Sequence, residues 1–279
     1  MAEFADAVFT DEAVRFLESD NETPFFLAVW WTTPHNPYVA PPDYMNLYDP
    51  DALTLRANWR PGARLGSRDD LAGYYAAIQF LDDQIGRLLD VLEADGRAGN
   101  TIVLLTSDHG DMLGSQGTVL KRKPWEESIA VPGVIRYPAA IPAGGAPELL
   151  LSHVDMVPTL LGLAGVAPPP GMDGLDLSGF LTGARSDGRP ESVYLQSYTP
   201  TEAGEHPPWR GVRTERYTYA RHADRPWLFY DNREDPFQQR NLIGSPEHAS
   251  VERELDEATM AWFARTGDDW RERRDLPYR

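Results

Sequence analysis

The 279-residue sequence contains no cysteine, and this absence excludes disulfide bonds and zinc sites built on thiolates. It contains no run of eighteen apolar residues, so we expect no segment that spans a membrane. Positive charge is scarce: the formal net charge is -17 at pH 7, which argues against non-specific binding to nucleic acid or to an anionic membrane. Residues 1–6 lack the basic and apolar regions of a signal peptide. The content of 42% hydrophobic and 11% aromatic residues predicts a packed globular core.

Lysine is also scarce, and its position is informative. Only two of the 26 Lys and Arg residues are lysines, Lys121 and Lys123, and they are separated by a single residue. A positive charge at this place is a candidate for binding an anionic substrate. The alternative is a solvated loop lysine paired with Glu126 or Glu127, an arrangement that contributes little to stability.

A carboxylate and an imidazole stand just before these lysines. Asp108 and His109 follow the apolar run Ile102–Leu105 after Thr106 and Ser107, and this pattern predicts a strand that ends just before the pair. Open α/β sheets place their sites at the C-terminal ends of strands, and both side chains are possible ligands of a divalent cation. The alternative is an acidic turn, because an Asp after a strand is often a helix cap.

The first two thirds of the chain alternate between patterns typical of helices and of strands. The expected helices cover about residues 10–18, 70–94 and 155–164, and the expected strands about residues 25–31, 101–106, 133–137 and 149–151. The run Phe25–Trp31 is apolar throughout, as in a strand that is buried on both faces. Strands that alternate with helices predict a parallel sheet covered by helices.

The pattern changes after a Pro- and Gly-rich connector at residues 166–190. Short aromatic-rich strands with tight connections indicate an antiparallel sheet, at residues 192–197, 209–214, 217–221 and 228–231, and an amphipathic helix is expected at residues 251–265. We therefore predict two domains, an α/β core at residues 1–184 and a smaller α+β subdomain at residues 185–279.

His35 lies between two prolines at the end of the expected strand Phe25–Trp31. If this strand and the strand before Asp108 are parallel in one sheet, His35 and the Asp108–His109 pair emerge at the same edge. The alternative is a turn histidine that hydrogen-bonds to local backbone.

Several motifs occur in an order that resembles the sulfatase family of the alkaline-phosphatase-like superfamily. In chain order they are Thr33-Pro-His-Asn-Pro-Tyr38, Asp82-Asp-Gln-Ile-Gly86, Thr106-Ser-Asp-His-Gly-Asp-Met-Leu-Gly114, Lys121, Trp125-Glu-Glu-Ser128, Ser152-His-Val-Asp-Met-Val-Pro-Thr-Leu160 and Leu228-Phe-Tyr-Asp-Asn-Arg-Glu-Asp-Pro236. The resemblance covers nearly the whole chain. It implies an alkaline-phosphatase-like parallel-sheet core, here incomplete, with the smaller antiparallel subdomain after it.

The resemblance also implies roles for five residues. Asp108 and His109 match the family's late pair of metal ligands, usually for calcium. His35 matches the histidine that contacts the sulfate or its leaving oxygen. Lys121 matches the lysine that binds the sulfate oxygens, and Lys123 is the less favoured candidate for substrate binding. The implied substrate is a sulfated small molecule or glycan, whereas the oligomeric state and the compartment stay open.

Two parts of the family's pattern are not found in this sequence. Sulfatases carry an acidic metal-binding pair on an early strand, followed by a Cys/Ser-x-Pro-Ser-Arg context whose first residue becomes the formylglycine nucleophile. We therefore expect a C-terminal portion of a sulfatase that is inactive on its own, with an incomplete calcium shell and an exposed apolar sheet edge. The alternatives are a non-catalytic binding protein derived from a sulfatase, and a phosphonate or phosphate ester hydrolase of the same superfamily.

Overall fold

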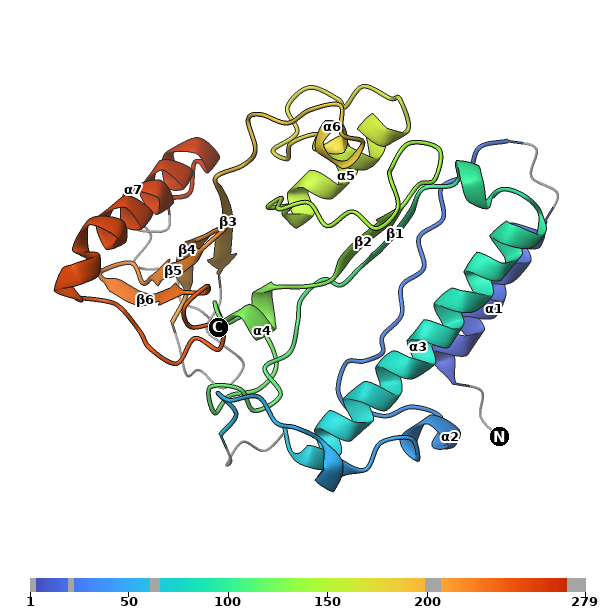
Figure 1. Cartoon of the computed structure of the whole chain (residues 1–279), viewed down its shortest axis with the longest axis horizontal. Coiled ribbons are helices and arrows are strands. Elements are labelled where there is room, and N and C mark those ends of the chain that lie inside the picture. The colour runs from blue at the N-terminus through green and yellow to red at the C-terminus, as the bar shows by residue number, and fades with distance from the viewer. Residues whose placement is uncertain (1–3, 20–22, 61–65, 199–206, 270–279) are drawn as a thin grey trace. The chain divides into compact units, whose positions relative to one another are not determined.

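A computed structural model describes residues 4–19, 23–60, 66–198 and 207–269 of the chain (Figure 1). The chain forms two compact units, which are described separately below. Unit 1 comprises Met1–Val103, Leu113–Val119 and Tyr137–Ala139, and unit 2 comprises Leu104–Met112, Leu120–Arg136 and Ala140–Arg279. The predicted domain boundary at residue 184 stays a prediction.

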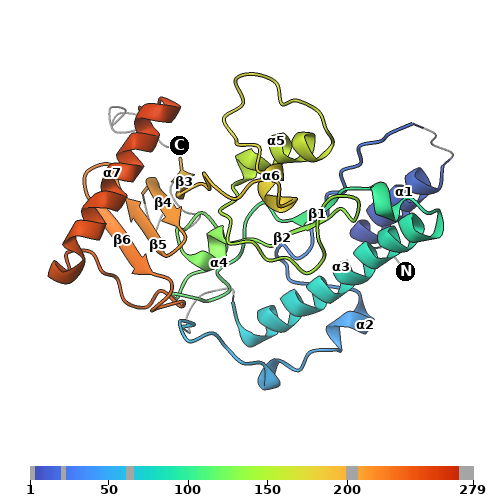
Figure 2. The same ribbon diagram turned by 45° about the horizontal axis from the view of Figure 1, so that its top comes forward.

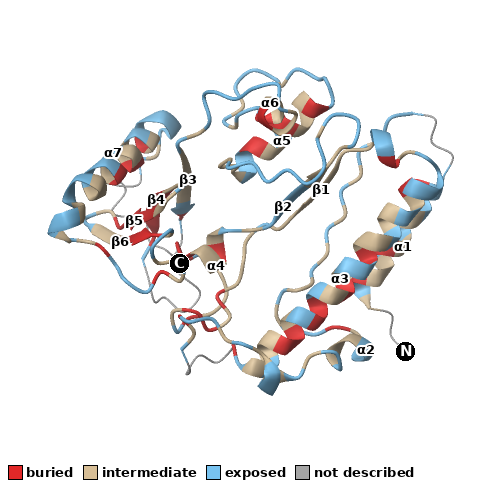
Figure 3. Cartoon of the chain, viewed as in Figure 1, coloured by how far each residue is buried: buried red, intermediate tan, exposed pale blue. Residues whose placement is uncertain are grey.

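Unit 1 is built around two long helices that lie side by side. Their bounds, with those of the shorter helical segments, are α1 Ala5–Glu18, α2 Pro42–Met45, η1 Pro50–Ala52, α3 Arg68–Ala94 and η2 Ala98–Asn100. Helix α3 begins at a capping box formed by Ser67 and Asp70, which satisfies backbone N–H groups that the helix leaves unpaired. Its buried residues include Ala76, Ala77 and Phe80 (Figure 3). Ile78, which the three-and-four spacing of the larger apolar residues places on the core face, is instead 44% exposed.

Helix α1 begins five residues earlier than the sequence indicated. The ring of Phe4 packs edge-on against Phe80 at a centroid distance of 5.1 Å, and this contact anchors the first turn. Thr10, expected at the helix start, instead lies within the helix and donates from Oγ1 to the carbonyl oxygen of Asp6 at 2.9 Å.

The expected strand at residues 25–31 is extended, but it belongs to no sheet in the part of the chain that the structure describes. Phe25 and Leu27 pack against the core around α1 and α3, whereas Phe26 is 84% and Trp30 81% exposed. The prediction of burial on both faces is therefore wrong. Apolar side chains allow a segment to be buried, but a strand also needs a neighbouring strand with which its backbone can form hydrogen bonds.

Unit 2 contains the strand that leads to the Asp108–His109 pair. Strand β1, Val103–Thr106, starts at the junction with unit 1 and pairs with β2, Gly133–Arg136. Three helices follow these strands or lie between them: α4 Glu126–Ile129, α5 His153–Leu163 and α6 Ser178–Leu181. Residues 149–151, expected as a strand, have no regular structure, so that expectation is also wrong.

The C-terminal part of unit 2 is an antiparallel sheet in the order β3-β4-β5-β6 (Figure 2). The strands are β3 Ser192–Ser197, β4 Trp209–Thr214, β5 Tyr217–Arg221 and β6 Pro226–Asp231, and the helical segments after them are η3 Pro246–His248 and α7 Ala249–Thr266. A cross-strand row of Val212, Tyr219 and Phe229 packs with Leu255 of α7. The antiparallel pairing of these strands confirms the sheet that the sequence predicts. Because successive side chains of a strand point to opposite faces of the sheet, this row is separated from a second buried set of residues.

The second buried set joins this sheet to the segment around α4. Trp125, which precedes α4, packs with Met112, Trp209, Leu228 and Tyr230. No helix in the described ranges is long and apolar enough to cross a bilayer.

Candidate functional site

Asp108 and His109 lie just beyond the end of β1, as the sequence predicts. His109 Nδ1 lies 2.9 Å from the carbonyl oxygen of Gly110. Because a carbonyl oxygen only accepts, this nitrogen carries the hydrogen and the neutral ring keeps its lone pair on Nε2. Nε2 lies 3.4 Å from Oδ2 of Asp108, whose side chain is 77% exposed. An imidazole nitrogen and a carboxylate oxygen thus converge at one exposed point.

The backbone of this pair is held from two sides. Ser107 Oγ donates to the carbonyl oxygen of His109 at 2.8 Å, and His153 Nε2 at the start of α5 donates to the carbonyl oxygen of Ser107 at 2.8 Å. Gly110 N donates to the carbonyl oxygen of Ser128 at 3.0 Å. A Cβ at position 110 would lie 2.0 Å from the carbonyl oxygen of Glu127, so only glycine allows this close approach to α4.

The two lysines differ in their surroundings although they are near neighbours. Lys121 is half-buried, whereas Lys123 is 2% exposed. Lys123 Nζ donates to the carbonyl oxygen of Lys121 at 3.2 Å, so one ammonium group supports the backbone that carries the other. This difference favours Lys121 for contact with a ligand, although the roles of both lysines stay predictions.

His35 lies in unit 1, on an exposed turn. Its Nδ1 donates to the carbonyl oxygen of Asn36 at 2.8 Å, and the Asp6 carboxylate accepts from the backbone N–H groups of Thr32 and Thr33 at 3.0 and 2.9 Å. The turn is therefore anchored on α1 through Asp6. The structure brings Asp108, His109 and both lysines into unit 2, and the convergence of His35 with them stays a prediction.

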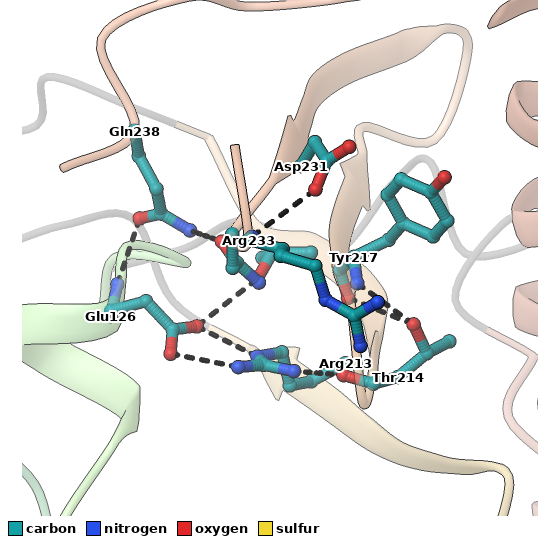
Figure 4. A network of polar contacts seen from close by, with 9 residues as sticks. Glu126, Arg213, Thr214, Tyr217, Asp231, Arg233 and Gln238 are labelled. Atoms are coloured by element: carbon teal, nitrogen blue, oxygen red, sulfur yellow. Dashed lines mark hydrogen bonds and ion pairs between the residues drawn. The ribbon is translucent and has the colours of Figure 1, made fainter. Parts of the chain in front are cut away.

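A network of polar contacts, shown in Figure 4, joins α4 to the C-terminal sheet. Glu126 accepts from Arg213 through both carboxylate oxygens, at 2.9 and 3.1 Å, and Glu126 N donates to Oε1 of Gln238 at 2.9 Å. The alternative that the Glu126 carboxylate serves as a partner of the lysines is not supported, since its contacts go to the sheet. Motif reading missed Gln238 and Arg213 because both are far from Glu126 in the sequence.

The donor set around Asp108 and His109 fits two positions of a metal shell. Among the described residues no group of three or more His, Asp or Glu side chains is arranged to hold a metal ion. Calcium takes six to eight oxygen ligands, so these two residues alone would supply only part of a calcium site. The hydrogen bond from His109 Nδ1 to a carbonyl oxygen orients the ring as the outer contacts of metal-binding histidines do.

The fold is of the alkaline-phosphatase-like class found in sulfatases and phosphonate hydrolases. A solved structure in complex with its substrate D-glucosamine-2-N,6-O-disulfate matches with a TM-score of 0.88 at 22% identity, covering 98% of this chain and 72% of that chain. The phosphonate monoester hydrolase from Silicibacter pomeroyi matches with a TM-score of 0.82 at 25% identity, covering 94% of this chain and 60% of that chain.

Within this class the chain belongs to the sulfatase family. The family's sequence model matches residues 2–166, and the model of the N-sulphoglucosamine sulphohydrolase C-terminal region matches residues 114–263. The ulvan-active sulfatase of Formosa agariphila is 36% identical over 278 residues, which cover 97% of this chain and 54% of the relative. The chain thus spans about half the length of this relative.

Proposed function

We propose that this chain contributes the sulfate-binding and late metal-binding part of a sulfuric ester hydrolase site. The observation that carries the proposal is the arrangement in unit 2, where α4 joins the segment of Asp108 and His109 to the segment of Lys121. Such an arrangement presents two possible metal ligands and an ammonium group on one connected framework.

Each residue then has a role in the reaction. Cleavage of a sulfate ester places negative charge on the leaving oxygen and on the sulfuryl oxygens, and fixed donors stabilise it where it develops. Lys121 binds the sulfuryl oxygens. His35 hydrogen-bonds to the sulfate or its leaving oxygen, and Lys123, whose ammonium is buried, supports the backbone of Lys121.

Asp108 and His109 would hold a divalent cation, and calcium suits the carboxylate. Such an ion would neutralise the charge of the sulfate when bound. The two residues supply only part of a calcium shell, so we propose that further oxygen ligands come from elsewhere.

The sequence offers no candidate for the formylglycine nucleophile, because it holds neither a cysteine nor a Ser-x-Pro-x-Arg context. We propose that the chain alone does not turn over sulfate esters, and that residues 1–184 and 185–279 are a core portion and a subdomain of a longer catalytic unit. Fusion of this chain behind the part of the Formosa agariphila relative that precedes the matched segment gives a completed chain.

The proposed substrate is a sulfated glycan. Support comes from the relative described as ulvan-active and from the structural neighbour with a disulfated glucosamine as its substrate. A phosphonate ester is the second candidate, and the match to a phosphonate monoester hydrolase favours it. A third candidate function is that of a binding protein that does not turn over an ester.

The chain itself provides the first test. Purified chain supplied with calcium is expected to leave 4-nitrophenyl sulfate unhydrolysed over hours, since its sequence offers no precursor of the formylglycine nucleophile. Hydrolysis that disappears in Asp108→Ala, but persists when the exposed Asp90 on α3 is replaced by Ala, would contradict the proposed incompleteness.

A further inference from the structure

The short helix α4 lies between the two segments that carry the candidate site residues in unit 2. The carbonyl oxygen of Ser128 accepts from Gly110 N at 3.0 Å, and Ser128 Oγ accepts from Lys123 N at 3.3 Å. One residue of α4 therefore contacts the backbone of both segments. Any shift of α4 would move the Asp108–Gly110 segment and the Lys121–Lys123 segment together.

A helix of four residues has no hydrophobic core of its own, so contacts with other parts of the chain have to hold α4 in position. Glu126, the first residue of α4, contacts two strands of the C-terminal sheet and the segment that follows the sheet. Its carboxylate accepts from Arg213 of β4 at 2.9 and 3.1 Å and from Thr218 Oγ1 of β5 at 3.1 Å. Its backbone N–H donates to Gln238, which follows β6.

These contacts close into a ring of hydrogen bonds. Gln238 Nε2 donates to Asn232 Oδ1 at 2.8 Å, and Asn232 Nδ2 donates to Thr218 Oγ1 at 2.8 Å. Gln238 is 1% and Thr218 0% exposed, so loss of one member deprives a buried polar side chain of one of its hydrogen bonds. Such a ring, with Arg213 paired to it, holds the start of α4 in one place.

We propose that Glu126 is a positioning residue, through which the C-terminal sheet holds α4 and thereby sets the arrangement of Asp108, His109 and Lys121. The kind of ligand that this arrangement binds, an anionic sulfate ester, rests on the proposed function. The positioning itself rests on the contacts within unit 2.

The scarcity of lysine allows a direct test on the full chain. Lysine labelled with carbon-13 at Cε gives two side-chain NMR signals, and Lys121→Arg assigns them. In Glu126→Ala we expect both signals to shift, and the acetylation rate of Lys123, measured by mass spectrometry, to rise by about tenfold or more because the buried ammonium becomes accessible. Arg216→Ala is the matched control, since it removes a charged pair with Asp231 on the same sheet and should leave both signals in place.

A second pair of variants covers the case in which Glu126→Ala does not fold. Thr218→Val removes the hydroxyl that joins Glu126 to Asn232 but keeps the side-chain shape, and Thr218→Ser retains the hydroxyl. We expect the lysine signals to shift in the Val variant and to return in the Ser variant. Unchanged lysine signals and acetylation rates in folded Glu126→Ala and Thr218→Val would overturn the proposal.

Titration with sodium sulfate separates this inference from the proposed function. A sulfate-dependent shift of the Lys121 signal that is weakened in Glu126→Ala supports both. Lysine signals that respond to Glu126→Ala but not to sulfate support the positioning role and count against the sulfate-binding role of Lys121.

Discussion

Lys121 and Lys123 are separated by one residue, yet the structure gives their side chains different exposure. Because Lys121 is half-buried and Lys123 is 2% exposed, Lys121 is the better placed to meet a sulfate. In the completed chain we expect Lys121→Ala to lower kcat/KM for an aryl sulfate by about a hundredfold or more, as the loss of one charge-stabilising donor typically does. Lys123→Ala should lower it far less, and equal losses would show that the wrong lysine has been chosen.

His222 gives the stability of the C-terminal sheet a dependence on pH. Burial lowers its pKa, although the hydrogen bond to the carbonyl oxygen of Pro208 partly opposes this, with smaller effects from Arg225 and Asp224. Its ring also stacks on Trp227 at a centroid distance of 4.5 Å. With the folded pKa below the ordinary value of about 6.5, the unfolded chain binds the proton first. The stabilising effect is therefore present above about pH 6.5 and is lost as the pH falls below it.

We expect the free energy of unfolding to fall less between pH 7.5 and 5.5 in His222→Gln than in the original chain. Urea unfolding followed by tryptophan fluorescence at the two pH values measures the difference. An equal fall in both proteins would show that His222 does not titrate on unfolding.

At the scale of elements, the local sequence pattern is sufficient to predict a helix or strand where the segment's own residues determine its structure. Helix α3 was predicted from its spacing of apolar residues, and strands β3, β4 and β5 from short aromatic-rich runs between turns. Residues 25–31 and 149–151 were wrongly predicted as strands. Their apolar runs satisfy one requirement of a strand, but pairing depends on backbone that lies elsewhere in the sequence.

The Asp108–Gly110 segment packs so closely against α4 that a single methyl group added at residue 110 should strongly lower the stability of the fold. Gly110→Ala would place its Cβ 2.0 Å from the carbonyl oxygen of Glu127, and we expect it to lower the free energy of unfolding by more than about 2 kcal/mol. Gly86→Ala in α3, where nothing lies within 4 Å of the added atom, should instead raise it by about 0.5–1 kcal/mol. Urea unfolding of both variants is the measurement, and a neutral Gly110→Ala would refute the close packing.

At the scale of the whole molecule, sequence motifs predicted the candidate site residues but not what holds them. Asp108, His109 and Lys121 stand in contiguous motifs, so their type and order are visible in the sequence. Glu126 and Gln238 are 112 residues apart, and no periodicity or motif connects them. Their contact depends on how β4, β5 and β6 assemble, which is a property of the folded chain.

The exposure of apolar residues is a second property at this scale. Phe26 and Trp30 lie on one face of an extended segment whose other face is packed in unit 1. Because this segment belongs to no sheet in the described ranges, the expected apolar sheet edge stays a prediction.

The most direct test of the account is the turnover of aryl sulfate and aryl phosphonate by the completed chain, measured side by side with calcium present. We predict a higher kcat/KM for the sulfate, with activity lost in Asp108→Ala and in Lys121→Ala while circular dichroism shows that the fold is retained. A preference for the phosphonate, or sulfate turnover that survives both substitutions, would contradict the assignment of these residues to a sulfuric ester hydrolase site.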